Sequence, residues 1–254
     1  MKIAVITGAS SGIGKEFVKQ LTENESFDEV WVIARREDRL FNLKEEMGDF
    51  IKPLSLDLES REDIDRYKKL LEEKKPEVAV LVNASGYGKF EAFSDLSLDS
   101  QLGMIDLNAK ALTAVTYITL PYLKRGSRVY QMGSLSSFQP VPYIAVYGAT
   151  KAYVLSFTRA VNAELRHTGI KMMAVCPGWV RTEFFDRAVV DDDIITYYNK
   201  FFTPKEVVKR ALRDMKKGKD VSVVGLSIRM QVLATKLLPH KLVMKVWLKQ
   251  QKKK

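Results

Sequence analysis

Cysteine and histidine are both scarce in this chain of 254 residues, which has one cysteine and two histidines. A single cysteine, Cys176, excludes an internal disulfide and is consistent with a reducing compartment. It ends the apolar run Met172–Cys176, where we interpret it as a small buried residue rather than a reactive thiol. His167 and His240 are too few for a histidine-rich metal site, so we predict no metal and expect both at the surface.

Long apolar runs are missing as well. No stretch reaches the roughly 18 consecutive apolar residues of a membrane-spanning helix. The segment Met1–Thr7 enters a strand-like pattern directly, without the charged and apolar regions of a secretion signal. We therefore expect a cytoplasmic protein.

Acidic residues are absent after Asp220, although the whole chain has 31 acids against 41 lysines and arginines. Residues 226–254 hold eight of those bases, which leaves 33 bases against 31 acids elsewhere. The formal net charge of +10 is therefore concentrated in the tail, and the body is nearly neutral. Since nucleic-acid binding needs basic residues gathered where phosphates lie, we predict no nucleic-acid partner.

Short apolar, β-branched runs alternate with stretches of helical spacing. The runs that indicate buried strands are Ile3–Thr7, Val30–Ala34, Pro53–Leu56, Val78–Val82, Arg128–Met132, Lys171–Cys176 and Val221–Val224. The stretches with helical spacing are Ile13–Thr22, Leu40–Met47, Arg61–Leu71, Gln101–Leu123, Val146–Arg166 and Pro204–Met215. The alternation predicts an α/β fold: a single doubly wound Rossmann-type domain over residues 1–254, with about seven parallel strands and helices on both faces. Ligands of such a fold bind at the carboxyl ends of the strands.

A glycine-rich segment follows the first expected strand and leads into a helix. The segment Thr7–Gly14 has the spacing G-x-x-x-G-x-G. Glycines let a pyrophosphate approach the backbone closely, and the N–H groups at the helix start favour its negative charge. The alternative is simply a tight strand-to-helix turn. The residues predicted to contact a dinucleotide here are Gly8, Ser10, Ser11, Gly12, Ile13 and Gly14.

Two arginines stand where a dinucleotide enzyme distinguishes NAD from NADP. Ala34 supplies no acid to bind the ribose hydroxyls, and Arg35 and Arg36 follow it. Because a guanidinium attracts a 2′-phosphate, we predict NADP(H) in preference to NAD(H). The alternative is a solvated pair at the start of the next helix, with Glu37 and Asp38 as partners.

The third and fourth expected strands also end at candidate coenzyme contacts. Asp57 and Leu58 follow the third strand, within reach of an adenine, and Asn83, Ala84 and Ser85 follow the fourth. Their place on the binding edge favours contact with a dinucleotide, although both sets are also ordinary strand-end turns.

Ser134, Tyr147 and Lys151 carry the strongest indication of chemistry. Tyr147 and Lys151 are four residues apart, so they project from one face of a helix. A free phenol has a pKa of about 10, which a neighbouring ammonium lowers by stabilising the phenolate. At the end of the fifth expected strand, Ser134 can hydrogen-bond a substrate oxygen as negative charge develops on it. Nicotinamide would supply the hydride.

These motifs resemble those of the short-chain dehydrogenase/reductase family over almost all of residues 2–224. The matching segments are Thr7–Gly14, Asp57, Leu81–Gly86, Asn108, Ser134, Tyr147–Lys151 and Pro177–Thr182. The resemblance implies that Tyr147 is the general acid in reduction and the base in oxidation. It implies that Lys151 binds the nicotinamide ribose and lowers the tyrosine pKa, that Ser134 orients the carbonyl, and that Asn108 holds a relay water.

The resemblance has further implications for ligands and assembly. It implies contacts with the nicotinamide end from Pro177, Gly178, Val180 and Thr182. The segment 83–86 reads Asn-Ala-Ser-Gly where the family commonly has Asn-Asn-Ala-Gly, a departure that affects a coenzyme-side hydrogen bond and no catalytic group. Similarity to bacterial reductases of unassigned substrate and to microsomal 3-ketoacyl and 17-beta-hydroxysteroid reductases implies an apolar or acyl substrate. A homodimer or homotetramer, formed through Gln101–Leu123 and Val146–Arg166, is also implied.

Two segments outside these motifs carry expectations of their own. Residues 184–202 form the longest irregular stretch, with the acid run Asp191–Asp193, and we predict a lid over the substrate. Residues 226–254 form a basic amphipathic extension with a lysine stripe at Lys241, Lys245 and Lys249. It either lies peripherally at an anionic membrane surface, or packs over the substrate mouth or against another subunit.

Together these observations predict an enzyme that transfers a hydride between NADP(H) and a carbonyl or alcohol. The main alternative is a non-catalytic NADP(H)-binding sensor that acts through a partner, against which the presence of all four candidate catalytic side chains argues. A serine hydrolase is disfavoured, because Met132–Ser136 lacks the G-x-S-x-G elbow and no histidine is suitably placed.

Overall fold

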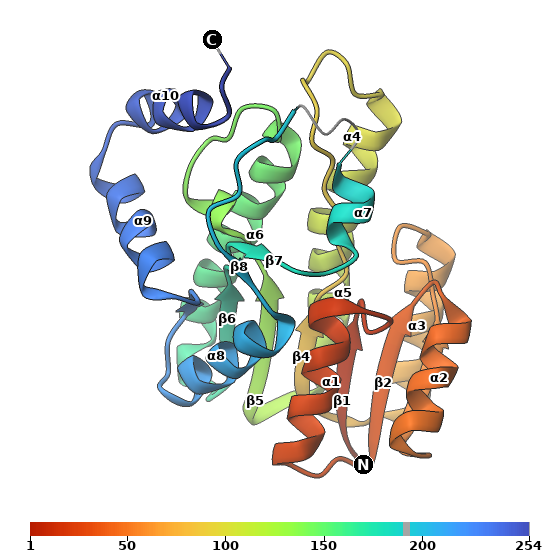
Figure 1. Ribbon diagram of the computed structural model, residues 1–254. Coiled ribbons are helices and arrows are strands. Elements are labelled where there is room, and N and C mark those ends of the chain that lie inside the picture. The colour runs from red at the N-terminus through yellow and green to blue at the C-terminus, as the bar shows by residue number, and fades with distance from the viewer. Residues whose placement is uncertain (190–193, 254) are drawn as a thin grey trace.

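The computed structural model describes residues 1–189 and 194–253, so the acid run Asp191–Asp193 lies outside the described residues. Within this part of the chain, seven parallel strands form one sheet in the order β3-β2-β1-β4-β5-β6-β9 (Figure 1). The strands are β1 (Lys2–Thr7), β2 (Glu29–Ala34), β3 (Ile51–Ser55), β4 (Glu77–Asn83), β5 (Leu123–Met132), β6 (Lys171–Val175) and β9 (Val221–Ser222). Each overlaps one of the seven expected runs, so the predicted sheet is confirmed.

The strand order reverses beside β1. The chain runs outward from β1 through β2 to β3, and then returns to the other side of β1 with β4. Thr7 at the end of β1 therefore pairs with Ile33 on one side and with Asn83 on the other. The connections that leave such neighbouring strands run to opposite faces, which opens a crevice at the carboxyl edge of the sheet.

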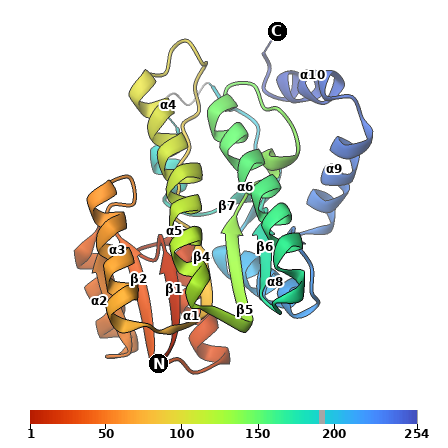
Figure 2. The same ribbon diagram turned by 180° about the vertical axis from the view of Figure 1, so that it is seen from behind.

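Helices cover both faces of the sheet, as predicted. Figure 1 shows α1 (Gly12–Asn24), α2 (Glu37–Met47) and α8 (Pro204–Lys216) on one face. Figure 2 shows α3 (Arg61–Lys74), α4 (Leu98–Ile105), α5 (Leu112–Thr119) and α6 (Ala145–Glu164) from the other side. A π-helical turn, Asp106–Ala111, joins α4 to α5, and 3₁₀ turns cover Leu120–Tyr122, Leu135–Phe138 and Leu165–His167. The expected helix Gln101–Leu123 is thus composed of four pieces.

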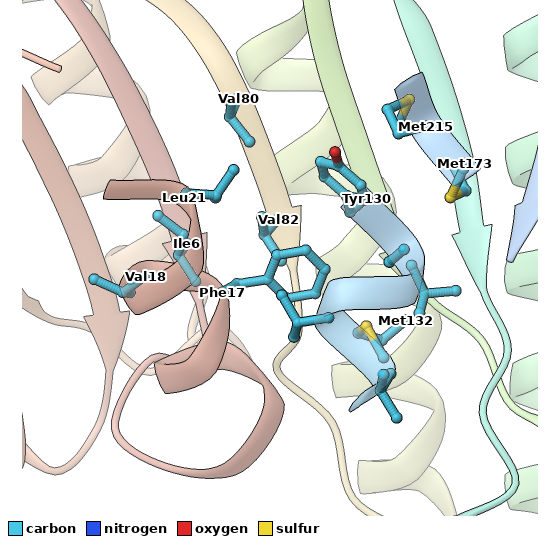
Figure 3. Close-up of a cluster of buried hydrophobic side chains, with 14 of the residues drawn as sticks. Ile6, Phe17, Val18, Leu21, Val80, Val82, Tyr130, Met132, Met173 and Met215 are labelled. Carbon is cyan, nitrogen blue, oxygen red and sulfur yellow. The ribbon is translucent and has the colours of Figure 1, made fainter. Parts of the chain in front are cut away.

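Successive side chains of each buried strand point to opposite faces of the sheet, so they belong alternately to two hydrophobic cores, one on each face. In β1, Ile6 belongs to the core under α1 and α8, whereas Val5 belongs to the core under α3 and α5. Figure 3 shows the first of these cores, where Phe17 of α1 packs against Tyr130 with ring centroids 5.1 Å apart. Because both faces are covered, the strands are continuous apolar runs rather than alternating ones.

The segment 184–202 is more regular than we expected. It begins with α7 (Phe184–Ala188) and ends with β8 (Phe201–Phe202), which pairs in parallel with β7 (Trp179–Val180). Aromatic contacts hold this segment against β7, since the rings of Phe185 and Tyr198 have their centroids 5.8 and 4.9 Å from that of Trp179. The prediction of an irregular stretch is therefore wrong at both ends of the segment.

The C-terminal extension consists of α9 (Leu226–Leu237) and α10 (His240–Gln250), which lie along one side of the molecule in Figure 1. It is attached to the body by polar contacts. Trp247 donates from Nε1 to the carbonyl oxygen of Pro142 at 3.1 Å, and Gln251 Oε1 accepts from the amides of Thr196 and Tyr197 at 2.9 and 3.0 Å. The extension is thus packed on the body of the protein, and both alternatives for its role stay predictions.

Candidate active site

A cavity of about 460 Å³ lies at the carboxyl end of the parallel strands. Residues that follow six of the strands converge on it, as the topology requires. The predicted site residues that line it are Gly8, Ser10, Ser11, Gly12, Ile13, Gly14, Arg35, Arg36, Asp57, Leu58, Ala84, Ser85, Ser134, Tyr147, Lys151, Pro177, Gly178, Val180 and Thr182. Two predicted residues, Asn83 and Asn108, are not among the lining residues.

The glycine-rich loop packs tightly against its neighbours. Gly8 has a φ of +66°, in the left-handed region, and a Cβ there would lie 2.6 Å from the carbonyl oxygen of Ala84. A Cβ on Gly14, in the first turn of α1, would overlap the carbonyl oxygen of Gly8. Only glycine fits these two positions. The packing brings the N-terminus of α1 to the cavity, where its N–H groups favour a phosphate.

Arg36 lies over the glycine-rich loop. Its Nη2 donates to the hydroxyls of Ser10 and Ser11 at 3.0 and 2.9 Å, and its Nη1 contacts Glu183 Oε2 at 2.7 Å. Arg39 also pairs with Glu183, and these hydrogen bonds to the two arginines hold the pKa of the Glu183 carboxyl below its usual value. Sequence reasoning missed Arg39 and Glu183, because nothing local links a residue near the second strand to one 147 positions away.

Arg35 points to a different group of acids. Its Nη1 lies 3.7 Å from Asp57 Oδ2 and 3.4 Å from Glu59 Oε2, with 52% of its side chain exposed. The alternative partners Glu37 and Asp38 pair with neither arginine in the contacts of the described residues. The two arginines therefore border the coenzyme end of the cavity from separate positions.

Asn83 stabilises the sheet rather than contacting the cavity through its side chain. Its Nδ2 donates to Thr116 Oγ1 at 3.0 Å and to Gln131 Oε1 at 2.9 Å, and the side chain is buried. These bonds tie β4 to α5 and β5. The side chain of Asn83 is therefore engaged within the fold and its contact with a coenzyme stays a prediction, whereas Ala84 and Ser85 line the cavity.

The three candidate catalytic side chains line the same cavity as the glycine-rich loop. Ser134 follows β5 directly, and its Oγ accepts from the amide of Ser136 at 3.2 Å. Tyr147 and Lys151 project together from α6, and Lys151 Nζ lies 5.6 Å from the centroid of the Tyr147 ring. The same Nζ donates to the carbonyl oxygen of Met132 at 2.8 Å, which holds the amine against the end of β5.

Burial sets the protonation of this group. It raises the pKa of Tyr147 to about 12, although a hydrogen bond with the Ser134 side chain opposes the rise. It lowers the pKa of Lys151 to about 8, because the low-polarity surroundings disfavour the ammonium. We expected Lys151 to lower the tyrosine pKa, and the structure instead shows a raised value in which burial dominates. Tyr147 is therefore a protonated phenol at neutral pH.

Asn108 lies in the π-helical turn and is fully buried. Its Oδ1 accepts from the amide of Tyr87 at 3.1 Å, while its Nδ2 donates to the carbonyl oxygen of Tyr87 and to Thr150 Oγ1 at 2.8 and 3.1 Å. Thr150 immediately precedes Lys151 on α6. The contacts thus connect Asn108 to the catalytic helix, and its role with a relay water stays a prediction.

The far end of the cavity is lined by apolar and aromatic side chains. Phe184 packs on Tyr147 with ring centroids 5.6 Å apart, so the first residue of α7 closes over the phenol. Val141, Ile144 and Trp247 form the opposite lining, and each is at least nine-tenths buried. Phe184 belongs to the segment predicted as a lid and Trp247 to the C-terminal extension, whereas no motif identified Val141 or Ile144.

The cysteine and the two histidines lie where the sequence predicts. Cys176 is buried, and burial raises the pKa of its thiol to about 12, which makes it unreactive. His167 and His240 are both exposed. Among residues 1–189 and 194–253, no cluster of three or more His, Cys, Asp or Glu side chains forms a metal-binding group.

The strand order, the glycine-rich loop and the polar set at the cavity define a Rossmann-type dinucleotide-binding protein. The family model described as short chain dehydrogenase matches residues 2–193. A relative from Staphylococcus epidermidis, named an uncharacterized oxidoreductase, is 33% identical over 71% of this chain and 79% of its own length. One of the same description from Staphylococcus aureus is 28% identical over 90% and 96%.

A solved structure is similar over nearly the whole fold. The short-chain dehydrogenase from Sphingobium yanoikuyae, in complex with NADPH, is 27% identical with a TM-score of 0.78, covering 93% of this chain and 94% of that one. The chain therefore belongs to the short-chain dehydrogenase family and is an oxidoreductase of that family. The resemblance inferred from the motifs is confirmed.

Proposed function

We propose that this chain is an NADP(H)-dependent oxidoreductase that interconverts a carbonyl and an alcohol on an apolar or acyl substrate. The observation that carries the proposal is the convergence of Ser134, Tyr147 and Lys151 in one cavity with the glycine-rich loop. Family membership alone would leave the reaction open, since one fold hosts many functions.

The residues around the coenzyme end fit NADP(H). Gly8 and Gly14 let the loop pack closely against Ala84 and against itself, so that the N-terminus of α1 lies at the cavity, where a pyrophosphate would bind. Arg36 lies beside the hydroxyls of Ser10 and Ser11, an arrangement suited to a 2′-phosphate. We place the adenine near Asp57 and the nicotinamide near Pro177–Thr182. When bound, the coenzyme supplies or accepts the hydride.

The proton is handled by the chain itself. In reduction, the Tyr147 hydroxyl donates its proton to the carbonyl oxygen. Its raised pKa keeps the hydroxyl protonated, and so able to donate, at neutral pH. The Ser134 hydroxyl hydrogen-bonds the same oxygen and stabilises its developing negative charge. Lys151, with a pKa of about 8, is a cation at neutral pH and stabilises the phenolate that remains. Asn108 positions this helix and, in the proposed relay, a water beside the lysine.

The cavity lining favours a substrate with a bulky apolar group. Phe184 packs on the Tyr147 ring, and Trp179 and Trp247 line the same cavity, so a charged chain there would lose hydration without finding a partner. We propose that α7 and residues 194–202 form the cover over this substrate.

A carbonyl panel followed by NADPH absorbance tests the proposal. We expect turnover of at least one apolar ketone or aldehyde, and a loss of roughly 10²- to 10⁴-fold in Tyr147→Phe with NADPH binding retained. Tyr153→Phe is the matched control, because this tyrosine lies on the same helix, is 43% exposed and does not line the cavity. NADPH binding without turnover of any compound would favour the non-catalytic sensor.

We also propose that the chain forms a homodimer or homotetramer through α4 to α6. Leu98, Leu102 and Ile105 on α4 and Tyr117 on α5 are large apolar side chains that are 44–77% exposed. Such a face is commonly covered by another subunit. Light scattering coupled to size-exclusion chromatography measures the assembly, and a monomer at all concentrations would contradict it.

A further inference from the structure

Helix α9 presents an exposed apolar stripe. Leu226, Met230, Leu233 and Leu237 recur at helical spacing, share one face, and are 68%, 57%, 48% and 74% exposed. The opposite face is already packed, since Ile228 is fully buried in the core. Single exposed apolar residues are ordinary, but four on one helical face indicate an interaction surface.

Helix α10 continues the pattern. Leu242 is 45% exposed, whereas Val243 and Trp247 are buried and line the cavity; Val246, 48% exposed, also lines it. The inner faces of both helices are thus used by the body, and the outer faces carry the apolar excess. We name these outer residues the tail stripe: Leu226, Met230, Leu233, Leu237 and Leu242.

Basic side chains accompany the tail stripe, without any acid. Lys241, Lys245 and Lys249 are exposed on α10, and Arg229 and Lys236 are exposed on α9. No acidic residue occurs after Asp220. The extension therefore combines exposed apolar groups with charge of a single sign, on helices that flank the substrate end of the cavity.

We propose that α9 and α10 dock on the surface of an anionic lipid bilayer. The tail-stripe residues would enter the boundary between headgroups and acyl chains, while the lysines extend to the lipid phosphates. Charge complementarity favours an anionic bilayer over a second copy of the chain as the binding partner, because a symmetric contact between two copies would bring one basic surface against another. Among the helices of residues 1–189 and 194–253, none combines the length and apolar character needed to cross a bilayer, which agrees with a position on its surface.

Docking in this way would place the cavity beside the lipid. Leu238, Val243 and Val246 line the cavity and belong to the same extension, so the bilayer would cover the substrate end. Apolar carbonyl compounds concentrate in lipid, and they would reach Tyr147 without crossing water. This consequence rests on the proposed function, whereas the docking itself does not.

Vesicle sedimentation of the full chain tests the docking. Vesicles of phosphatidylcholine alone are compared with vesicles that also contain phosphatidylglycerol, at low and high salt. The stripe variant is Leu226→Ser/Leu233→Ser/Leu237→Ser, and the charge variant is Lys241→Gln/Lys245→Gln/Lys249→Gln. Their matched controls alter exposed residues outside the extension and outside α4 to α6: Phe41→Ser/Phe93→Ser and Lys68→Gln/Lys69→Gln/Lys74→Gln. NADPH binding and circular dichroism confirm that each variant is folded.

We expect the wild type and both controls to sediment with the anionic vesicles and to be released by salt. The charge variant should partition about 100-fold more weakly, since each lysine near an anionic surface contributes roughly a factor of five. Absence of wild-type sedimentation, or equal partitioning of tail and control variants, would overturn the proposal. If the wild type does not bind vesicles and the stripe variant changes the oligomeric mass, the tail stripe is an interface with a second copy of the chain.

The two proposals can fail separately. Sedimentation needs no turnover, so a chain without reductase activity still gives a decisive result on docking. If docking holds and the carbonyl panel is silent, the extension remains a membrane surface on a protein of another function. If turnover occurs without sedimentation, the enzyme acts away from lipid.

Discussion

Replacing Arg36 by alanine isolates the preference for NADP(H) from the rest of the site. The guanidinium contacts the hydroxyls of Ser10 and Ser11 and pairs with Glu183, and it touches neither Tyr147 nor Lys151 in the contacts of the described residues. In the proposed complex the 2′-phosphate takes a place among these groups. Arg36→Ala therefore removes a phosphate contact while leaving the proton-handling side chains in position.

The size of the effect follows from the number and exposure of the contacts. A hydrogen bond to a charged group contributes about 1.5–3 kcal/mol, which corresponds to roughly 10- to 150-fold in affinity. The Arg36 side chain is 28% exposed, so solvent screening reduces the interaction. We expect NADPH to bind about 10- to 30-fold more weakly to Arg36→Ala. NADH has no 2′-phosphate, and its affinity should change by less than about threefold.

Fluorescence titration with each coenzyme measures the two affinities without a known substrate. Arg39→Ala is the control, because this arginine pairs with Glu183 but does not reach the serines of the loop. It should weaken NADPH binding less than Arg36→Ala does. Equal losses for NADPH and NADH in Arg36→Ala would show that the arginine supports the loop rather than the phosphate, and would refute the reasoning.

Two further predictions concern protonation and the sheet. Because burial lowers the pKa of Lys151 to about 8, its charge is present below that pH and lost above it, so carbonyl reduction should fall as pH rises through 8. Lys151→Arg keeps its charge, and an unchanged fall in that variant would assign the titration to another group. Asn83→Ala should lower the free energy of unfolding by about 1–3 kcal/mol in urea denaturation, because it leaves the buried Gln131 Oε1 without the donor that Asn83 supplies. Unchanged stability with weakened NADPH binding would instead restore the coenzyme contact first predicted for Asn83.

The sheet could be predicted from the sequence because strands that are buried on both faces need apolar residues at successive positions, a pattern that is visible locally. Each strand is a short apolar run, and its ends carry the loops that bind ligands. The regular ends of residues 184–202 could not be found in this way. They depend on contacts such as that of Trp179 with Tyr198, 4.9 Å between ring centroids, which join residues from separate parts of the chain.

The coenzyme end shows the same division. Arg36 follows the second strand, where residues of a Rossmann-type fold contact the ribose of the coenzyme, so its place at the cavity was predictable. Its partner Glu183 is 147 residues away, and no spacing rule connects them. Asn83 shows what a strand-end position leaves open, because this position predicts a coenzyme contact while the side chain is hydrogen-bonded to Thr116 and Gln131 within the fold.

Tyr147 and Lys151 show most clearly what spacing can and cannot determine. Four residues on a helix bring the two side chains together, and the structure has them 5.6 Å apart, measured from the amine to the ring centroid. The sign of the pKa shift depends on how deeply the pair is buried, which is a property of the whole fold. Burial raises the pKa of Tyr147 to about 12, so the phenol carries its proton throughout the neutral range. A protonated phenol is the form that carbonyl reduction needs, whereas alcohol oxidation needs the phenolate. In the proposed mechanism, reduction therefore uses the phenol in the form that it has at neutral pH, and oxidation should become faster as the pH rises only while Lys151 keeps its charge.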